Sequence, residues 1–471
     1  MKELNTVDLF CGAGGASTGL ELALSRLKMC HKGLAINHWA VAVDTMKRNH
    51  PDIDTKQMSI EEAVPADLVP SGEVDLLWAS PSCTHHSRAK GGKPRSNQLR
   101  AQPELVLTWL DQLFVRRLII ENVPEFVEWG PLGKDGKPIK RKKGECFQKW
   151  VEAIEARNYK VEWRIMNCAD YGDATSRRRF FLKAVRKGCG KIRWPEPTHA
   201  ENPQPDLFRH ELKKWRGVRE CLDLSDMGRS IFNRDRPLSK NTLRRVAVGM
   251  EKYNGMDFLM DMLGIDGGDD SRVHPLTDPM PTQHSGGNRC AVVRPFVVRL
   301  NKNCDAESVD APLSTVTANG QHHALCQPLI IDHCKNGEAK PIDAPLGPQH
   351  THDRYSIATP LILDMSRPGG HDSGHVRSAD KPIQTLTTCD NVQVATPVIF
   401  DEAVGLPRLP DGRYIDIFLR MLKPSELAAA HSFPKDYVLT GNRSDQVKQI
   451  GNSVPVMTAA AMCEVDFKEI A

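Results

Sequence analysis

The first 190 residues alternate short apolar runs with amphipathic stretches that are typical of helices. The apolar runs cover residues 6–10 (TVDLF), 74–80 (VDLLWAS), 116–120 (RRLII) and 177–185 (RRRFFLKAV). Strands that are apolar along most of their length are buried on both faces of a sheet, whereas half-exposed strands alternate apolar and polar positions. The pattern therefore predicts an α/β fold with a Rossmann-like parallel sheet that helices cover on both faces.

After residue 197 the helical pattern fades, proline becomes frequent, and four segments align with one another at intervals of about 33 residues. Each segment is typical of a strand, a polar turn and a second strand. The alignment rests on two sets of prolines, Pro279, Pro312, Pro345 and Pro382, and Pro295, Pro328, Pro360 and Pro397. We expect a second, β-rich domain over residues 198–411, with the repeats at about 275–401. The repeats are either a structural scaffold or a frame whose polar tips contact a ligand.

The last part of the chain, residues 412–471, returns to a helical pattern and ends in an apolar, alanine-rich helix. A helix of that composition needs a partner surface. We therefore expect it to pack on the N-terminal sheet, so that residues 1–197 and 412–471 form one domain.

Composition places the chain among soluble globular proteins. It has 471 residues, 40% of them hydrophobic and 26% charged, and no apolar run reaches the ~18 residues of a membrane helix. The N-terminal residues lack the pattern of a secretory signal. Thirteen cysteines without a CxxC pair are typical of reduced thiols. We expect a cytoplasmic protein without a membrane partner.

Charge is informative in its distribution, because the net charge is only +4. Residues 84–102 hold five basic residues and no acid, and residues 134–143 hold six basic residues and one acid. Such runs can follow a phosphate backbone. The alternative is that each run is a solvated loop.

A glycine-rich turn, DLFCGAGGASTG, follows the first predicted strand. Gly12, Gly14 and Gly15 allow a tight turn and a close approach of the backbone to a ligand. The turn differs from the dinucleotide pattern GxGxxG, because Ser17 stands at the third glycine. By itself the turn indicates little, since any tight strand-to-helix connection can be rich in glycine.

Cys83 follows the second apolar run listed above, and Glu121 and Asn122 follow the third. Ligands of open α/β sheets gather at the carboxyl ends of the strands, so the turn, the thiol and the carboxyl group are predicted to share one crevice. Basic neighbours such as His85 can help a thiol to ionise. Cys83, His85 and His86 are too close in sequence for a usual zinc site, so no metal is predicted.

The chain resembles the DNA (cytosine-5)-methyltransferases over nearly its full length. Six segments are similar to family motifs in the family's order: DLFCGAGGASTGLE, SPSCTHHS, ENVPEF, TSRRRFFL, RMLKPSELAAAHSFP and QIGNSVPV. The resemblance implies methyl transfer from S-adenosylmethionine to carbon 5 of cytosine in duplex DNA. It also implies that the target base is flipped out of the helix.

The resemblance assigns roles by position. Cys83 is the implied nucleophile that adds to carbon 6, Glu121 binds ring nitrogen 3, Arg179 binds the cytosine carbonyl, and Arg177 supports the site. The implied cofactor-binding residues are Phe10, Gly12, Gly14, Gly15, His38, Trp39, Pro81, Asn452 and Ser453. The implied DNA-binding residues are Ser87, Arg88, Lys90, Lys93, Arg95 and Asn122. The region between the motifs corresponds to the family's target-recognition domain.

Four positions depart from the family pattern. Ser82 and Thr84 flank the nucleophile in place of proline and glutamine, Thr175 replaces the glutamine of the arginine motif, and His38 stands where an acid usually binds the cofactor ribose. A DNA-binding protein with an impaired site and an RNA cytosine methyltransferase are the alternatives. The resemblance also implies a bacterial or phage origin and a cognate restriction endonuclease as a candidate partner.

Overall fold

The computed structural model describes residues 3–81, 102–133, 138–204, 211–226 and 415–469, with shorter segments between residues 228 and 408. It divides into two compact units. The first comprises residues 1–223, 277–289 and 422–471, and the second comprises residues 224–276 and 290–421. Residues 198–223 therefore pack with the first unit, whereas the sequence analysis placed them in the second domain.

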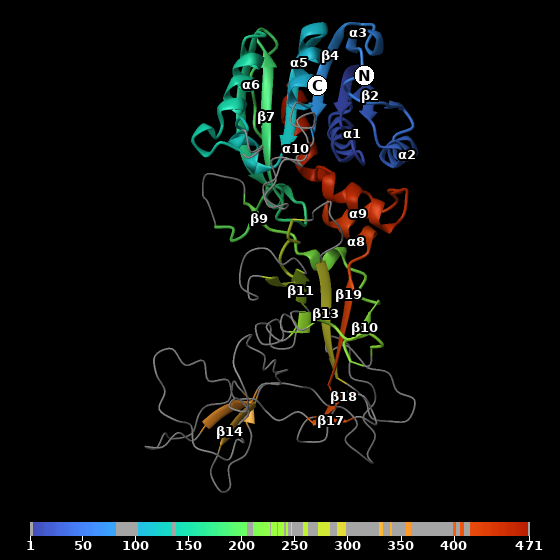
Figure 1. Ribbon diagram of the computed structural model, residues 1–471, viewed down its shortest axis with the longest axis vertical. Coiled ribbons are helices and arrows are strands. Elements are labelled where there is room, and N and C mark those ends of the chain that lie inside the picture. The colour runs from blue at the N-terminus through green and yellow to red at the C-terminus, as the bar shows by residue number, and fades with distance from the viewer. Residues whose placement is uncertain are drawn as a thin grey trace. The chain divides into compact units, whose positions relative to one another are not determined.

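The first unit is built on a seven-stranded sheet (Figure 1). In sheet order the strands are β3 (Ile53–Gln57), β2 (Cys30–Asn37), β1 (Glu3–Leu9), β4 (Glu73–Ala79), β5 (Phe114–Asn122), β7 (Arg178–Arg186) and β6 (Tyr159–Asn167). The first five strands in this order run parallel to one another, as predicted. β7 is antiparallel to both β5 and β6, which corrects the prediction of an all-parallel sheet.

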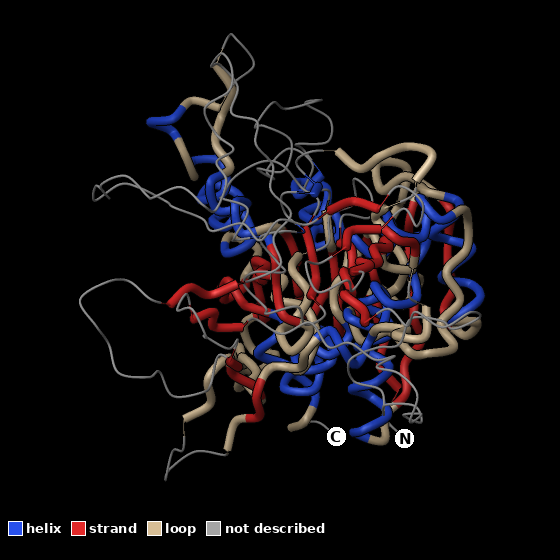
Figure 2. Tube along the Cα trace, turned by 90° about the horizontal axis from the view of Figure 1, so that it is seen from below, coloured by secondary structure: helices blue, strands red, loops and turns tan. Residues whose placement is uncertain are grey.

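Helices connect these strands and close the unit, and Figure 2 lets them be followed as helices, strands and loops along the trace. The α-helices are α1 (Gly15–Leu27), α2 (Ala40–Asn49), α3 (Pro65–Leu68), α5 (Gln102–Gln112), α6 (Glu145–Glu155), α8 (Pro424–Ala430), α9 (Arg443–Asn452) and α10 (Val456–Phe467). The 3-10 helices are η2 (Pro124–Glu128), η3 (Lys140–Lys142), η4 (Cys168–Tyr171) and η5 (Val218–Cys221). A short pair, β8 (His199–Ala200) and β9 (Lys213–Lys214), completes the unit. No described helix is long and apolar enough to cross a membrane.

Both faces of the sheet are covered, as the apolar strands predicted. On one face, side chains of α5 and α6 such as Trp109 and Trp150 pack on β1, β4 and β5. On the other face, Leu24 of α1 and Met462 of α10 pack on the same sheet. The expectation that the C-terminal helix packs on the N-terminal sheet is therefore confirmed.

The second unit is described in part. Its main sheet has the order β10 (Arg229–Ser230), β19 (Ile415–Met421), β13 (Cys290–Val297), β11 (Phe258–Asp261) and β12 (Val273–Pro275). Smaller groups are β14 (Leu329–Asp332), β15 (Lys340–Pro341) and β16 (Tyr355–Ala358), and β17 (Ile399–Asp401) with β18 (Leu406–Arg408). β14 and β17 follow Pro328 and Pro397 closely, but most of the four aligned segments lies outside the described residues, so the repeats stay a prediction.

Candidate functional site

The carboxyl ends of four parallel neighbours, β2, β1, β4 and β5, meet at one edge of the sheet. This edge carries the glycine-rich turn after β1, His38 and Trp39 after β2, Pro81 after β4, and Glu121 at the end of β5. Because β7 runs antiparallel, its first residues lie at the same edge, where Phe181 pairs with Glu121. The sheet thus brings the predicted cofactor residues and the arginine motif to one side.

The pair at the end of β5 is buried and charged. The Arg179 guanidinium lies 3.0 Å from a carboxyl oxygen of Glu121, and each side chain is 8% exposed. Burial raises the pKa of Glu121, while Arg179 and Arg177 lower it. The carboxyl group can therefore share a proton with a ligand, and two guanidinium groups stabilise its ionised form.

Arg177 is held by the C-terminal segment. Its side chain is buried, and its Nη2 donates to the carbonyl of Gly451, at 2.9 Å. Thr175, which replaces a glutamine of the family pattern, donates to the carbonyl of Met280 at 3.0 Å. Ser176 and Ala174 make backbone hydrogen bonds to Met280 on either side. The arginine motif is thus fixed from two distant parts of the chain.

Asn122 is almost fully buried, and its amide is used within the fold. Its Nδ2 donates to the carbonyl of Pro81 at 3.2 Å, and its Oδ1 accepts from the backbone N–H of Val123 at 2.9 Å. The side chain therefore joins the segments that follow β4 and β5. Direct contact of Asn122 with DNA stays a prediction.

The glycines of the turn have different surroundings. A Cβ on Gly15 would lie 2.2 Å from the carbonyl oxygen of Val454, and one on Gly14 would lie 2.4 Å from the sulfur of Met46. Gly12, at φ +55°, would meet nothing nearer than 3.9 Å. Packing thus explains Gly14 and Gly15, which the sequence analysis assigned to the cofactor, and Gly12 faces open space. Phe10 also has a positive φ, of 60°.

Hydrogen bonds also connect the glycine-rich turn to the C-terminal segment. Tyr437 donates its hydroxyl hydrogen to the carbonyl of Ala13. The His50 ring joins Tyr437 at 3.1 Å to Glu21 at 2.8 Å. Hydrogen bonds from His31 and His50 lower the pKa of Glu21 to about 2, against the effect of burial. The shape of the turn therefore depends on residues more than 400 positions away.

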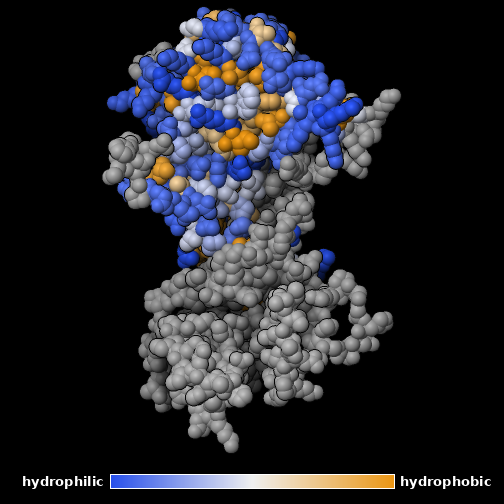
Figure 3. Space-filling model, turned by 90° about the vertical axis from the view of Figure 1, so that its left-hand side faces the viewer, coloured by the Kyte–Doolittle hydropathy of each residue, from blue (hydrophilic) through white to orange (hydrophobic). Residues whose placement is uncertain are grey.

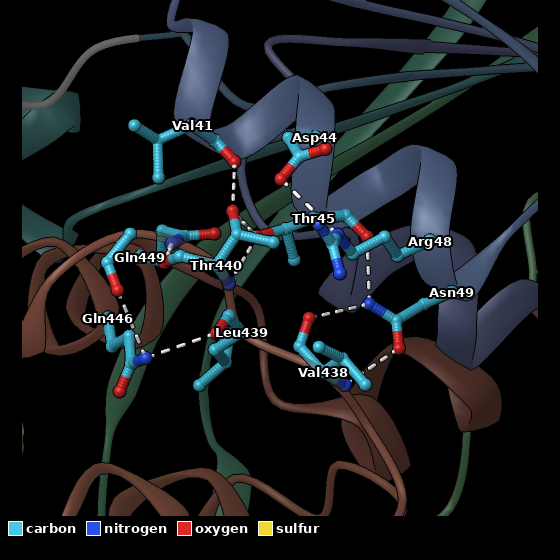
Figure 4. Close-up of polar contacts among 11 residues, drawn as sticks. Val41, Asp44, Thr45, Arg48, Asn49, Val438, Leu439, Thr440, Gln446 and Gln449 are labelled. Atoms are coloured by element: carbon cyan, nitrogen blue, oxygen red, sulfur yellow. Dashed lines mark hydrogen bonds and ion pairs between the residues drawn. The ribbon is translucent and has the colours of Figure 1, made fainter.

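A second set of hydrogen bonds fixes the same segment to α2 (Figure 4). Asn49 exchanges two hydrogen bonds with the backbone of Val438, at 2.9 and 2.8 Å. Thr440 donates to the carbonyl of Val41 at 2.8 Å and accepts, through Oγ1, at 2.9 Å from Thr45. These contacts hold residues 438–440 along α2.

The positions next to β2 are open to a ligand. His38 is exposed, and Trp39 is half-buried with the ammonium group of Lys448 at 4.3 Å from its ring centre. Asn452 is exposed at the end of α9, whereas Ser453 is buried and donates to the carbonyl of Ile450 at 2.8 Å. An aromatic ring, an exposed imidazole and the free space over Gly12 fit a cofactor that carries a nucleoside.

Three buried groups were not identified from the sequence. His431 lies 3.2 Å from the hydroxyl of Ser453, and burial lowers its pKa well below the usual range. Asp173 accepts the backbone N–H groups of Met457 and Thr458 at the start of α10. Burial raises the pKa of Asp8 to about 7, and one of its oxygens has no hydrogen-bond partner among the described residues. His431 and Asp8 stand inside quoted motifs, but only the structure shows their burial.

Several predicted site residues lie outside the described residues. They are Cys83, Ser87, Arg88, Lys90, Lys93 and Arg95. Their assignments stay predictions.

Comparison with known proteins gives one family. The pattern of the C-5 cytosine-specific DNA methylases matches residues 4–225 and 349–466. The type II methyltransferase M.AgeI of Thalassovita gelatinovora is 30% identical over 44% of this chain and 46% of its own length. M.AquIA of Picosynechococcus is 27% identical over 47% of this chain and 88% of its own length.

Coverage of these relatives is uneven: the matched region spans about half of M.AgeI and 14% of a rice DNA (cytosine-5)-methyltransferase, 1A. Among solved structures, a Spodoptera frugiperda DNMT2 mutant aligns over 98% of this chain and 99% of its own, with 13% identity and a TM-score of 0.47. The family pattern covers well over half of the chain and includes both the glycine-rich turn and the Glu121 motif. The chain belongs to the C-5 cytosine-specific DNA methylase family.

Proposed function

We propose that this protein transfers a methyl group from S-adenosylmethionine to carbon 5 of cytosine in duplex DNA. The observation that supports this most directly is the buried pair of Glu121 and Arg179, 3.0 Å apart, at the sheet edge that also carries the glycine-rich turn. Burial raises the pKa of this carboxyl group, and groups with a perturbed pKa cluster at functional sites.

The base-activating step uses three side chains of this chain. The Cys83 thiolate forms a bond to carbon 6 of a flipped cytosine, Glu121 shares a proton with ring nitrogen 3, and Arg179 donates to the ring carbonyl. Carbon 5 then becomes nucleophilic. Loss of the carbon-5 proton and cleavage of the sulfur–carbon bond release the methylated base and restore the thiolate.

S-adenosylmethionine, when bound, supplies the methyl group to carbon 5. Gly12 leaves room for it at the end of β1, and Trp39 offers a ring face for an adenine. His38, in place of an acid, can hydrogen-bond the ribose hydroxyls. The closely packed Gly14 and Gly15 act on this site by shaping the turn.

Recognition of DNA is assigned to the second unit and to the basic run after Cys83. The polar tips of the aligned segments are proposed to read base edges in the major groove. The residues Ser87, Arg88, Lys90, Lys93 and Arg95 are proposed to contact the backbone of the DNA near the flipped base.

The test is expression in a host that lacks cytosine methylation, followed by mapping of 5-methylcytosine in host DNA and RNA. We expect 5-methylcytosine in a defined DNA context, and its loss in Cys83→Ser, while DNA binding by that variant persists. Absence of the product in DNA with correctly folded protein, or its appearance in RNA only, would contradict the proposal.

A further inference from the structure

A basic turn, residues 138–144, follows β5 and the 3-10 helix η2 in the chain and is not explained by the catalytic site. Between residues 138 and 149 the chain has five basic residues and one acid. The side chains of Lys140, Arg141, Lys142 and Lys143 are all exposed. The sequence analysis left open whether this run is a solvated loop or a phosphate-binding element.

The structure fixes the backbone of the basic turn. The N–H of Gly144 donates to the backbone carbonyl of Glu128 at 3.2 Å, and the N–H of Ile139 donates to the carbonyl of Pro131 at 3.1 Å. A Cβ on Gly130 would lie 2.4 Å from the carbonyl oxygen of Lys142, so the two backbones are in close contact. These contacts fix the backbone of the basic turn, so its cations project from a defined place.

An aromatic cluster anchors the basic turn to the sheet. The ring of Phe126 packs against Phe147, Trp150 and Phe180, with ring centres 5.3–5.7 Å apart. Phe147 in turn packs edge-on against Trp163 of β6, with centres 5.3 Å apart. The cations and Trp163 thus belong to one rigid platform.

The basic turn and β6 line an open groove. Its lining includes the cations Arg141, Lys142 and Lys143, the polar residues Glu145 and Gln148 of α6, and the rings of Phe147 and Trp163. Trp163 is 42% exposed and Ile165 is 44% exposed, which is unusual for side chains of this size. Figure 3 shows hydrophobic residues among hydrophilic ones on this side of the first unit, where α6 and β7 lie in Figure 1.

The groove lies beside the segment that follows the end of β5, because Gly144, which lines it, donates its N–H to the carbonyl of Glu128 in η2. β6 is antiparallel to β7 and therefore runs in the same direction as β5. Trp163 lies at the middle of β6 and Ile165 in its second half, and η2 stands between the end of β5 and the basic turn in the chain. A duplex whose cytosine reaches Glu121 continues along this edge on one side of the target.

The cations are available for exchange. Lys142 lies 3.4 Å from Glu145, and Lys143 lies 2.8 Å from Glu128, with lysine side chains 45% and 57% exposed. Ion pairs this exposed contribute little, so a phosphate can replace the carboxylate. Arg141 makes no ion pair within the described part of the chain.

We propose that this groove, formed by the basic turn and Trp163, binds the phosphate backbone of the DNA that flanks the target cytosine. The inference rests on the proposed function for the presence of duplex DNA at this edge. Three adjacent exposed cations can neutralise backbone phosphates, and an exposed aromatic ring beside them offers a surface for a deoxyribose.

The test compares the salt dependence of binding to a fluorescein-labelled random-sequence duplex. The variant Arg141→Gln/Lys142→Gln/Lys143→Gln removes the proposed contacts. A control, Lys47→Gln/Arg48→Gln/Lys56→Gln, removes the same charge from exposed and half-exposed positions in the region of α2 and β3, at the opposite edge of the sheet. The slope of log affinity against log salt is expected to fall by about 0.9 per lost phosphate contact, or about 2.7 for three.

The control and the charge-conserving Arg141→Lys are expected to keep the wild-type slope. A groove variant with the wild-type slope would overturn the inference. Methyl incorporation by the wild type is measured in parallel, because it separates the proposed groove from the proposed methyltransferase function. Methylation with an unchanged slope contradicts the groove alone, and a changed slope without methylation contradicts the proposed function alone.

Discussion

The carboxyl ends of β1 and β5 belong to one sheet edge but are built differently. At the end of β1 the turn is shaped by backbone, by glycines in contact with Val454 and Met46, and by neutral hydrogen bonds from Tyr437. At the end of β5 the structure buries charge, with Glu121 against Arg179. The first region is thus defined by the shape of its backbone, and the second by a group that can exchange a proton.

The difference also decides how each region tolerates change. A shaped backbone is damaged by added volume, because a packed interior does not make room for even one methyl group. A buried ion pair is damaged by loss of one charge, because the remaining charge is left without compensation. Substitutions can therefore test whether the ends of β1 and β5 differ in their response to added volume and to lost charge.

The largest effect is expected from Glu121→Gln. Without an acid at the end of β5, methyl transfer should slow by about 10²–10⁴-fold, the usual contribution of a positioned acid or base. Single-turnover rates measure this, and Glu155→Gln on the exposed face of α6 is the matched control. A rate within a few-fold of the wild type would remove Glu121 from the chemistry.

The next effect concerns Asp8, the ionisable group buried beneath the turn after β1. Burial raises its pKa from 3.8 to about 7, so the folded protein favours the protonated form. The contribution of Asp8 to the free energy of unfolding is complete below about pH 4. As the pH rises to about 7, this contribution falls by roughly 2–4 kcal/mol.

Asp8→Asn removes this titration, so the free energy of unfolding should change less between about pH 5 and about pH 8 in the variant than in the wild type. Urea unfolding at both pH values measures it. Asp173, whose pKa burial raises to about 6, keeps part of the same trend in the variant. Equal pH dependence in both proteins would show that Asp8 is ionised in the fold.

Glycine substitutions test the shape of the turn. Gly15→Ala places a methyl group 2.2 Å from the Val454 carbonyl and should reduce the free energy of unfolding by about 1–3 kcal/mol or more. Gly12→Ala has room but a positive φ, which costs roughly 1–2 kcal/mol.

Gly72, with φ +69° and no atom within 4 Å of an added Cβ, is the matched control for Gly12. Gly12→Ala and Gly72→Ala should lose similar stability, and only the former should weaken S-adenosylmethionine binding in calorimetry. If cofactor affinity were the same in both variants, the open space over Gly12 would not be the cofactor site.

The smallest effect is expected at Lys448, above the ring of Trp39. Loss of an exposed cation–π contact amounts to about 0.5–1 kcal/mol, so Lys448→Ala should change the cofactor KM by only about two- to five-fold. Lys435→Ala, at another exposed position of the C-terminal segment, should leave it unchanged. A change of a hundred-fold would instead indicate direct contact of Lys448 with the cofactor.

The sequence predicts the strands of the first unit well because their burial on two faces leaves continuous apolar runs. It does not predict the direction of β7, since an apolar run such as FFLKAV reads the same in either direction. That direction decides the site, because only an antiparallel β7 brings Arg177 and Arg179 to the end of β5.

For the site, sequence and structure agree on where the residues gather and differ on what some of them do. Gly14, Gly15 and Asn122 were assigned to ligands, and the structure gives each a packing or positioning contact. His431 was missed because its role depends on its burial. It lies beside Ser453 and near Arg177, which is more than 250 residues away from it in the sequence. Long-range contacts of this kind leave no local pattern.

The contact between α1 and α10 has a consequence for synthesis. Arg26 pairs with Glu464, and Gly19 lies against Ala459, so the outer face of the sheet is completed by the last helix of the described chain. At about 5–20 residues per second, a ribosome needs on the order of 10–40 seconds to pass from residue 223 to residue 422. During that interval α1 presents an uncovered apolar stripe, and neither end of the catalytic edge has its C-terminal support. The first unit therefore lacks these contacts until residues 422–467 have been synthesised.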